Sequence, residues 1–321
     1  MPFNWEWDAA VGIYKNWQLS KKLRKVAAGA CIVAPFGRDY GIGFKANAGQ
    51  YINIMHIERL PNSPSSVLQE TNRIPIRKPA YGNRQIPVVE YGEGVEFTNL
   101  AEQLSYFKPS EQLQMLLKTQ MEEALDTATA QAFLDSTAVK VVFTPTGLTT
   151  STFSTTGTAA AVASAGMTFD HCTQISDYLV DTLYVPPFEG EHFVGITANK
   201  NYRSMKNDRY WQEWHKYLSK GDFVFKREMG ATELIRWVVC NRPLAFSNIA
   251  GTSPYLGQAV VFGDEAVARL EAEAPHLRLD NNYQSDFGRA KAVAWYGILG
   301  FGSVWDVPDA GKAKIIQINS L

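Results

Sequence analysis

Apolar side chains recur at helical spacing after Pro109 and predict one long amphipathic helix. The stripe advances in steps of three or four residues and mixes large with small side chains: Leu113, Leu117, Met121, Ala124, Leu125, Ala128 and Ala132. It extends over about 25 residues, and at a rise of about 1.5 Å per residue such a helix is about 40 Å long. A helix of this length, with so narrow a stripe, is typical of a structural spine.

An alternation with a period of two predicts a strand just before that helix. One face carries Val89, Tyr91, Val95 and Phe97, the other carries Glu90, Gly92, Gly94 and Glu96, and Glu93 departs from the pattern. Glycines inside a strand indicate a bulge, a bend or the close approach of another backbone. Thr98 is a suitable N-cap for a short helix over residues 99–105.

A proline-rich, charged segment separates this strand from an earlier one at Tyr51–Ile57. Residues 60–85 contain four prolines, a density that excludes a helix and a central strand. Unstructured segments of this length are uncommon inside compact domains unless they are functional or disordered. Between two strands, the segment is expected to form a long projecting hairpin. Its charges alternate with a basic surplus: Glu58, Arg59, Glu70, Arg73, Arg77, Lys78 and Arg84.

The second half of the chain alternates strand and helix patterns and predicts an α/β module. The expected strands are 139–145, 192–198, 235–240 and 259–262, and the expected helices are 169–185 and 201–218. Residues 146–166 are rich in Thr, Ser, Ala and Gly and are expected to form an exposed loop. Apolar strands at 288–305 and 313–319 complete an α+β fold.

Residues 1–45 do not predict a domain of their own. They combine bulky apolar groups with a short basic run: Trp5, Trp7, Ile13, Tyr14, Trp17, Lys21, Lys22, Arg24 and Lys25. One interpretation is an arm whose apolar side chains find their partners elsewhere. The alternative is that the tryptophans pack on their own domain, since apolar residues are buried by default.

Composition limits the class of function. The chain has 321 residues, of which 20% are charged and 45% hydrophobic, with a formal net charge of -1. These values give no global attraction toward nucleic acid or membrane. Cys31, Cys172 and Cys240 lie far apart without C-x-x-C spacing, which favours a reducing compartment over a zinc site or a disulfide framework. Without a signal-peptide pattern or a run of roughly 18 apolar residues, a cytoplasmic chain without membrane contact is expected.

No cluster of residues predicts a catalytic, metal or cofactor site. Glu90 and Glu96 share a strand face, but six residues of strand separate them by about 20 Å, beyond the roughly 5–9.5 Å of paired catalytic carboxylates. Residues 41–46 match a loose dinucleotide loop, yet a strand rather than a helix follows them. His171 and Cys172 are adjacent, which is the wrong geometry for a base and a nucleophile.

Residues 209–217 interleave aromatic and cationic side chains, a composition suited to stacking on single-stranded nucleic acid. However, Trp211, Trp214 and Leu218 fall on one helix face, which favours a role in the core. An α/β enzyme or a nucleic-acid-binding module that uses this helix therefore stays as the alternative function.

The order of these elements resembles the major capsid proteins of tailed bacteriophages with the Hong Kong 97-type fold, and within them the subgroup typified by coliphage N-four. The most specific match is Tyr91-Gly92-Glu93-Gly94-Val95-Glu96-Phe97-Thr98-Asn99-Leu100-Ala101, which is similar to that subgroup's entry into the spine helix. A weaker match is Val260-Val261-Phe262-Gly263-Asp264-Glu265-Ala266, interpreted as a strand and turn that enter a helix. The similarity extends from about Gly43 to the end of the chain.

The resemblance implies a division of the chain. Its parts are an N-terminal arm (1–45), an extended hairpin loop (46–97), the spine of a peripheral domain (98–138), an α/β axial domain (139–280), returning peripheral strands (281–306) and a last strand on the axial domain (307–321). It also implies a non-enzymatic chain that assembles in the host cytoplasm into hexamers and pentamers of a virion shell around double-stranded DNA. A separate scaffolding protein, a portal and a decoration protein would be its partners.

The same resemblance turns several residues into candidate contacts between subunits. In the extended loop these are Arg59, Glu70, Arg73, Arg77, Lys78 and Arg84. In the arm they are Trp5, Trp7, Trp17, Lys21 and Arg24. Gly92 and Gly94 are the expected hinge of the loop, because a hairpin that must tilt bends where side chains are absent.

Overall fold

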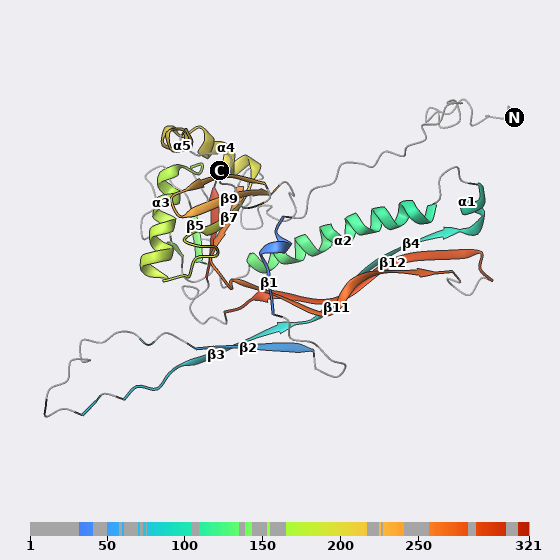
Figure 1. Ribbon diagram of the computed structural model, residues 1–321, viewed down its shortest axis with the longest axis horizontal. Coiled ribbons are helices and arrows are strands. Elements are labelled where there is room, and N and C mark those ends of the chain that lie inside the picture. Colours follow the sequence, from blue (N-terminus) through green and yellow to red (C-terminus); the bar gives the residue numbers. More distant parts are fainter. Residues whose placement is uncertain are drawn as a thin grey trace.

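Three β-sheets and one long helix organise the described part of the chain (Figure 1). The computed structural model describes residues 32–40, 50–57, 60, 70, 73–74, 76–104, 109–134, 139–142, 153–154, 165–216, 225, 227–240, 257–281, 287–305 and 314–320. The expected arm residues Trp5, Trp7, Trp17, Lys21 and Arg24, and the loop residue Arg59, lie outside these ranges.

A seven-stranded mixed sheet forms the centre of one lobe (Figure 1). Its strands are β5 (Val139–Val142), β6 (Phe153–Ser154), β7 (Phe193–Ala198), β8 (Glu228–Thr232), β9 (Ile235–Cys240), β10 (Gly257–Phe262) and β13 (Ile315–Ser320), in the order β6-β5-β13-β10-β7-β9-β8. β7 and β9 are parallel, whereas β10 is antiparallel to β7 and to β13. The strands are rich in Val and Ile because both faces of the sheet are covered.

Helices cover one face of this sheet, and the end of the spine covers the other. α3 (Phe169–Asp177), continued by a π-helical turn at Tyr178–Thr182, and α4 (Asn199–Lys206) pack against buried residues such as Trp237. On the opposite face, Phe133 lies 4.4 Å from Phe262 between ring centroids. Phe133 ends α2 (Pro109–Phe133), so the long helix joins this lobe to the rest of the molecule.

A four-stranded sheet lies along the remainder of α2 (Figure 1). It consists of β1 (Arg38–Asp39), β11 (Val267–Asp280), β12 (Ala290–Ser303) and β4 (Val89–Thr98), in that order. Leu117 of α2 packs between Val293 and Trp295 of β12. α2 is 25 residues long, as its apolar stripe predicts. The N-cap prediction is also confirmed: Thr98 Oγ1 accepts the backbone N–H of Ala101 at the start of α1 (Asn99–Leu104).

The third sheet is a hairpin of β2 (Tyr51–Ile57) and β3 (Tyr81–Pro87), paired from Tyr51↔Pro87 to Ile57↔Tyr81. This corrects two expectations. β3 lies inside the segment expected to be a loop, and β4 is not the second strand of the hairpin, because it pairs with β12 instead. The apolar alternation in β3 is weak because its inward face carries Gly82 and Arg84 beside the single large apolar residue Ile86.

Two further expectations from the sequence were wrong in detail. The turn after β10 leads into the strand β11 and not into a helix: Ala, Glu and Leu favour helix locally, but pairing with β12 over most of its length overrides this preference. The helix expected over residues 201–218 is two helices, α4 and α5 (Arg209–His215). Asp208 separates them, since its carboxylate accepts the backbone N–H groups of Tyr210 and Phe169.

Candidate functional site

One face of the β2–β3 hairpin is open to solvent and exposes several large apolar side chains beside the polar Asn53, Asn83 and Gln85. The exposed fractions are 55% for Tyr51, 81% for Met55, 63% for Ile57 and 69% for Tyr81. Ile57 and Tyr81 are cross-strand partners, so their side chains lie on the same face. We call this set the outer face of the hairpin. Met55, Ile57 and Tyr81 adjoin one another on this face, and adjoining exposed apolar residues are typical of an interaction surface.

The opposite face of the hairpin attaches it to the four-stranded sheet. Ile52, Ile54 and Ile86 are buried against Ala268 and Leu270 of β11. The hairpin is therefore anchored at its base, whereas the part near its tip extends beyond the sheet (Figure 1).

The candidate contact residues of the loop separate into two groups. Glu70, Arg73, Arg77 and Lys78 are exposed, next to the equally exposed Ile74 and Ile76. Arg84 differs, because it is only partly exposed and lies on the β3 face that also carries Ile86. Arg84 is thus directed toward its own subunit, and its expected contact with a neighbour stays a prediction.

The glycines at the hairpin base serve close packing. A Cβ atom added to Gly300 would lie 2.8 Å from the carbonyl oxygen of Pro87, and one added to Gly302 would lie 3.1 Å from Ile86. These two glycines of β12 allow the end of β3 to lie directly on the sheet. The sequence contains a sign of this close packing. The apolar run of residues 298–302 includes two glycines at positions where a central strand favours large side chains.

Gly92 and Gly94 also meet a neighbouring backbone. The pairing of β4 with β12 continues without a register shift from Val89 to Thr98, so there is no bulge at either glycine. A Cβ atom added to Gly92 would lie 2.9 Å from the carbonyl oxygen of Trp295. The sequence left open a bulge, a bend or the close approach of another backbone at these glycines, and this geometry favours the close approach. Their role as a hinge stays a prediction.

The three glutamates of β4 do not share one environment. Glu93 belongs to the face toward α2, where its carboxylate accepts a hydrogen bond from the side-chain amide of Gln120. The amide oxygen of Gln120 in turn accepts the indole N–H of Trp295. Glu90 and Glu96 lie on the opposite face of the strand. Glu93 is therefore part of a polar connection that joins β4, α2 and β12, which explains its departure from the apolar alternation.

A buried carboxylate anchors the first described residues to the spine. Asp126 of α2 is fully buried, and its Oδ1 atom accepts the backbone N–H groups of Ile32, Val33 and Ala34 at 3.0, 2.7 and 2.9 Å. We call this contact the arm anchor. The apolar periodicity of α2 gave no signal for it, because an acid among Ala and Leu looks like a solvent-exposed helix position.

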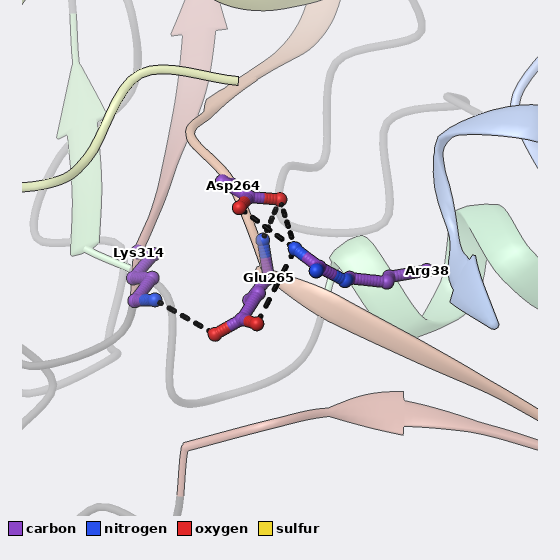
Figure 2. Close-up of polar contacts among 4 residues, drawn as sticks. All are labelled: Arg38, Asp264, Glu265 and Lys314. Carbon is purple, nitrogen blue, oxygen red and sulfur yellow. Dashed lines mark hydrogen bonds and ion pairs between the residues drawn. The ribbon is translucent and has the colours of Figure 1, made fainter. Parts of the chain in front are cut away.

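An ion-pair cluster lies where the two large sheets meet (Figure 2). Arg38 of β1 contacts both carboxylate oxygens of Asp264 at 2.7 and 2.8 Å and Glu265 at 3.3 Å. Lys314, just before β13, lies 3.7 Å from the other Glu265 oxygen. Burial lowers the pKa of Lys314, an effect that Glu265 partly opposes. The cluster ties β1 and the start of β13 to the β10–β11 turn.

The aromatic helix α5 is only partly a core element. Trp211 packs against the core and stacks on His215, with ring centroids 3.8 Å apart. Tyr210 and Trp214 are 70% and 45% exposed, so the prediction that Trp214 is a core residue was wrong. Leu218 lies outside the described residues.

The described residues contain no group of three or more His, Cys, Asp or Glu side chains placed to hold a metal ion. The Cys172 thiol is buried, and burial raises its pKa well above the usual range, which opposes a role as nucleophile. None of the described helices combines the length and apolar character needed to span a membrane.

The fold matches solved capsid structures over nearly the whole chain. The search against protein-family models and the search of curated proteins found no match. Among solved structures, a chain of the Helicobacter pylori bacteriophage KHP30 capsid, described as acidic stable, matches at a TM-score of 0.69 and 10% identity, covering 100% of this chain and 98% of that one. A chain of the cyanophage Pam1 capsid asymmetric unit matches at 0.67 and 15% identity, covering 95% and 98%.

The capsid of Ralstonia phage GP4 gives a similar result, with a TM-score of 0.66 at 12% identity over 98% of this chain and 97% of that one. This chain therefore has the fold of tailed-phage major capsid proteins, and the expected fold is confirmed. At this level of identity the likeness establishes the fold, whereas the narrower N-four-like subgroup stays a prediction.

Proposed function

We propose that this protein is the major capsid protein of a tailed bacteriophage, which assembles into the hexamers and pentamers of an icosahedral shell around double-stranded DNA. One observation carries the proposal: the chain matches subunits of phage capsids end to end, with 95–100% of its length and 98% of theirs covered in two of these structures. The role is structural and not enzymatic, and the location is the virion. No comparison favours the enzyme or nucleic-acid alternative.

The division of the chain follows from this proposal. Residues 1–45 are the arm, 46–97 the extended loop, and 98–138 the spine of the peripheral domain. The pairing of β11 with β12 supports placing residues 267–280 with the peripheral strands and ending the axial domain before Val267. Assembly in the host cytoplasm, with a separate scaffolding protein, a portal, a decoration protein and packaged DNA as partners, belongs to the same proposal.

The outer face of the hairpin is the principal contact with a neighbouring subunit in this proposal. Its exposed Met55, Ile57 and Tyr81 supply apolar area, and the nearby Arg73, Arg77 and Lys78 supply charge that sets the register with the partner.

Sedimentation and negative-stain electron microscopy of the purified protein test the proposal. We expect capsomers or closed shells many times the mass of one chain. A protein that remains monomeric at high concentration, with and without co-expressed phage assembly proteins, would contradict it.

A hairpin variant then tests the role of the loop. Replacing residues 60–79 with a short Gly-Asn linker keeps β2, β3 and the buried Ile52, Ile54 and Ile86, whereas deletion through residue 85 would remove the strand that pairs with β2. We expect a folded subunit, judged by its circular dichroism spectrum and cooperative melting, that no longer forms closed shells. Normal shells from this variant would contradict the assignment.

A further inference from the structure

The ion-pair cluster of Figure 2 lies where the chain crosses between the two large sheets. The β10–β11 turn is one crossing and carries Asp264 and Glu265, and Lys314 lies at a second crossing, just before β13. A backbone hydrogen bond connects the two crossings, since the N–H of Gly263 donates to the carbonyl oxygen of Lys314 at 3.3 Å. A movement of one sheet relative to the other would therefore strain the contacts of this cluster.

Glu265 joins the two cations of the cluster. One of its carboxylate oxygens lies 3.3 Å from Arg38, and the other lies 3.7 Å from Lys314. Its backbone has a φ of 56°, in the left-handed region that residues other than Gly rarely adopt. Backbone strain of this kind is concentrated at functional sites. Asp264 stabilises the strained turn by accepting the N–H of Glu265 at 2.9 Å.

Lys314 extends the cluster toward the hairpin. Its ammonium group lies 5.3 Å from the centroid of the Trp305 ring, so the same cation contacts a carboxylate and an aromatic face. Only 13% of the Lys314 side chain is exposed, and burial lowers its pKa while Glu265 raises it. A buried charge that loses its partner is strongly unfavourable, so loss of the Glu265 carboxylate would drive the ammonium group toward water and away from Trp305.

Trp305 is in turn part of the hairpin base. His56 of β2 packs on the Trp305 ring, with centroids 4.5 Å apart. The indole also packs against the apolar cluster that includes Ile52, Ile54 and Ile86. His56 Nδ1 and Trp305 Nε1 are buried without a hydrogen-bond partner in the described part of the chain. The contact of the two rings therefore depends on packing, and it is sensitive to any displacement of Trp305.

We propose that Glu265, Lys314 and Trp305 couple the hairpin to the junction of the two large sheets. Release of Lys314 from Glu265 loosens the Trp305 ring and with it the base of the hairpin. Displacement of the hairpin in turn weakens the ion pairs, because coupling between two sites is reciprocal. In a shell, a neighbouring subunit that binds the hairpin would also change the arrangement of the two sheets. This last step rests on the proposed function, whereas the coupling is a property of the single chain.

Hydrogen–deuterium exchange of β2 peptides, measured on the full-length chain before assembly, tests the coupling. Glu265→Gln keeps the size of the side chain but removes its charge. We expect it to accelerate exchange of β2 by about fivefold or more, the lower end of typical coupling between sites. Glu271→Gln is the matched control, because Glu271 belongs to a separate ion pair with Arg269 at 3.2 Å, and it should leave β2 unchanged. Slow exchange of β7 reports in each variant that the subunit stays folded.

A double-mutant cycle distinguishes this coupling from a general loss of stability. Trp305→Leu interrupts the path and accelerates exchange of β2 by itself, so the addition of Glu265→Gln should have no further effect on β2. If the two effects on the exchange rate multiply, the substitutions act independently and the inference is overturned. An unchanged exchange rate of β2 in Glu265→Gln alone would overturn it as well.

The reverse direction is measured from the hairpin. His56→Ala should accelerate exchange of peptides that span residues 262–267, whereas Met55→Ala, on the outer face, should not. Equal exchange of these peptides in the two variants would overturn the inference. Neither substitution changes a residue of the ion-pair cluster, so this measurement decides the question even if Glu265→Gln does not fold.

Electron microscopy of assembled samples keeps the coupling separate from the proposed function. Faster exchange of β2 in Glu265→Gln, in a protein that never forms shells, would support the coupling alone. Shells formed by a protein whose β2 does not respond to Glu265→Gln would support the function alone.

Discussion

The carboxylate of Asp126 accepts the backbone N–H of Val33 at 2.7 Å, across 93 positions of sequence. The same oxygen accepts the two flanking N–H groups, so one side chain orders three consecutive residues, Ile32, Val33 and Ala34. Phe36, just after them, packs on Phe188, Phe225 and Phe262 in an aromatic cluster of the lobe. The long helix, residues 32–36 and the seven-stranded sheet are joined at this point.

Substitution of Asp126 should therefore lower the stability of the folded protein. In Asp126→Ala, three buried N–H groups lose their acceptor, and we expect the free energy of unfolding to fall by about 3 kcal/mol or more. Urea unfolding followed by circular dichroism measures the change. Glu122→Ala, at an exposed position one turn earlier on the same helix, should stay within about 0.5 kcal/mol. Equal effects of the two substitutions would show that the arm anchor contributes little.

A methyl group at Gly300 should displace the base of the hairpin. Its Cβ atom would lie 2.8 Å from a backbone oxygen of Pro87, so one of the two strands must move, and we expect Gly300→Ala to destabilise the subunit by about 1–3 kcal/mol. Gly37→Ala is the matched control, since its Cβ atom would meet no neighbour closer than 3.5 Å. Thermal melting compares the two variants, and an unaffected Gly300→Ala would mean that the hairpin base adapts freely. Valine at Gly92 would not test a hinge, because it collides with β12 first.

The Gln120 side chain should contribute more to the free energy of unfolding than its partly exposed position suggests. It bridges Glu93 on β4 and the indole N–H of Trp295 on β12, and Trp295 is 2% exposed. We expect Gln120→Ala to lower the free energy of unfolding by about 1–3 kcal/mol, because a buried donor loses its acceptor. Gln114→Ala, at an exposed position of the same helix, is the control for helix propensity. Similar unfolding midpoints for both variants would count against the bridge.

The His215 side chain should make stability depend on pH. Burial lowers its pKa below the ordinary value of 6.5, so the folded protein disfavours the protonated ring. Above the unfolded-state pKa the ring is neutral in both states and no stability is lost. As pH falls from about 6.5 toward the folded-state pKa, the unfolded state binds the proton first, and the free energy of unfolding decreases.

His215→Phe keeps an aromatic ring on Trp211 but removes the titration. Unfolding midpoints measured between pH 7.5 and 5 should fall less steeply for this variant than for the unchanged protein. Identical slopes would place the pH dependence elsewhere.

The sequence determined the elements whose pattern is local. The apolar stripe of the spine helix, the alternation of β2 and β4, and the apolar strands β7, β9, β10, β12 and β13 each follow from a period of two or of three to four residues. The same patterns, through their order along the chain, carried the resemblance that the solved capsid structures bear out at the level of the fold.

The tertiary structure alone decided which strands pair and which polar groups are buried. β11 has helix-forming composition and becomes a strand because β12 offers it a partner, and β4 joins β12 rather than the hairpin for the same reason. From the sequence alone, Asp126 resembles a surface acid on a helix. In the folded chain it is buried, because the backbone N–H groups of residues 32–34, which lie 92–94 positions away in sequence, donate hydrogen bonds to it. Strand alternation already separated Glu93 from Glu90 and Glu96, but only the position of α2 gave Glu93 its hydrogen bond to Gln120. Such contacts depend on segments that lie far apart in sequence, and no local period encodes them.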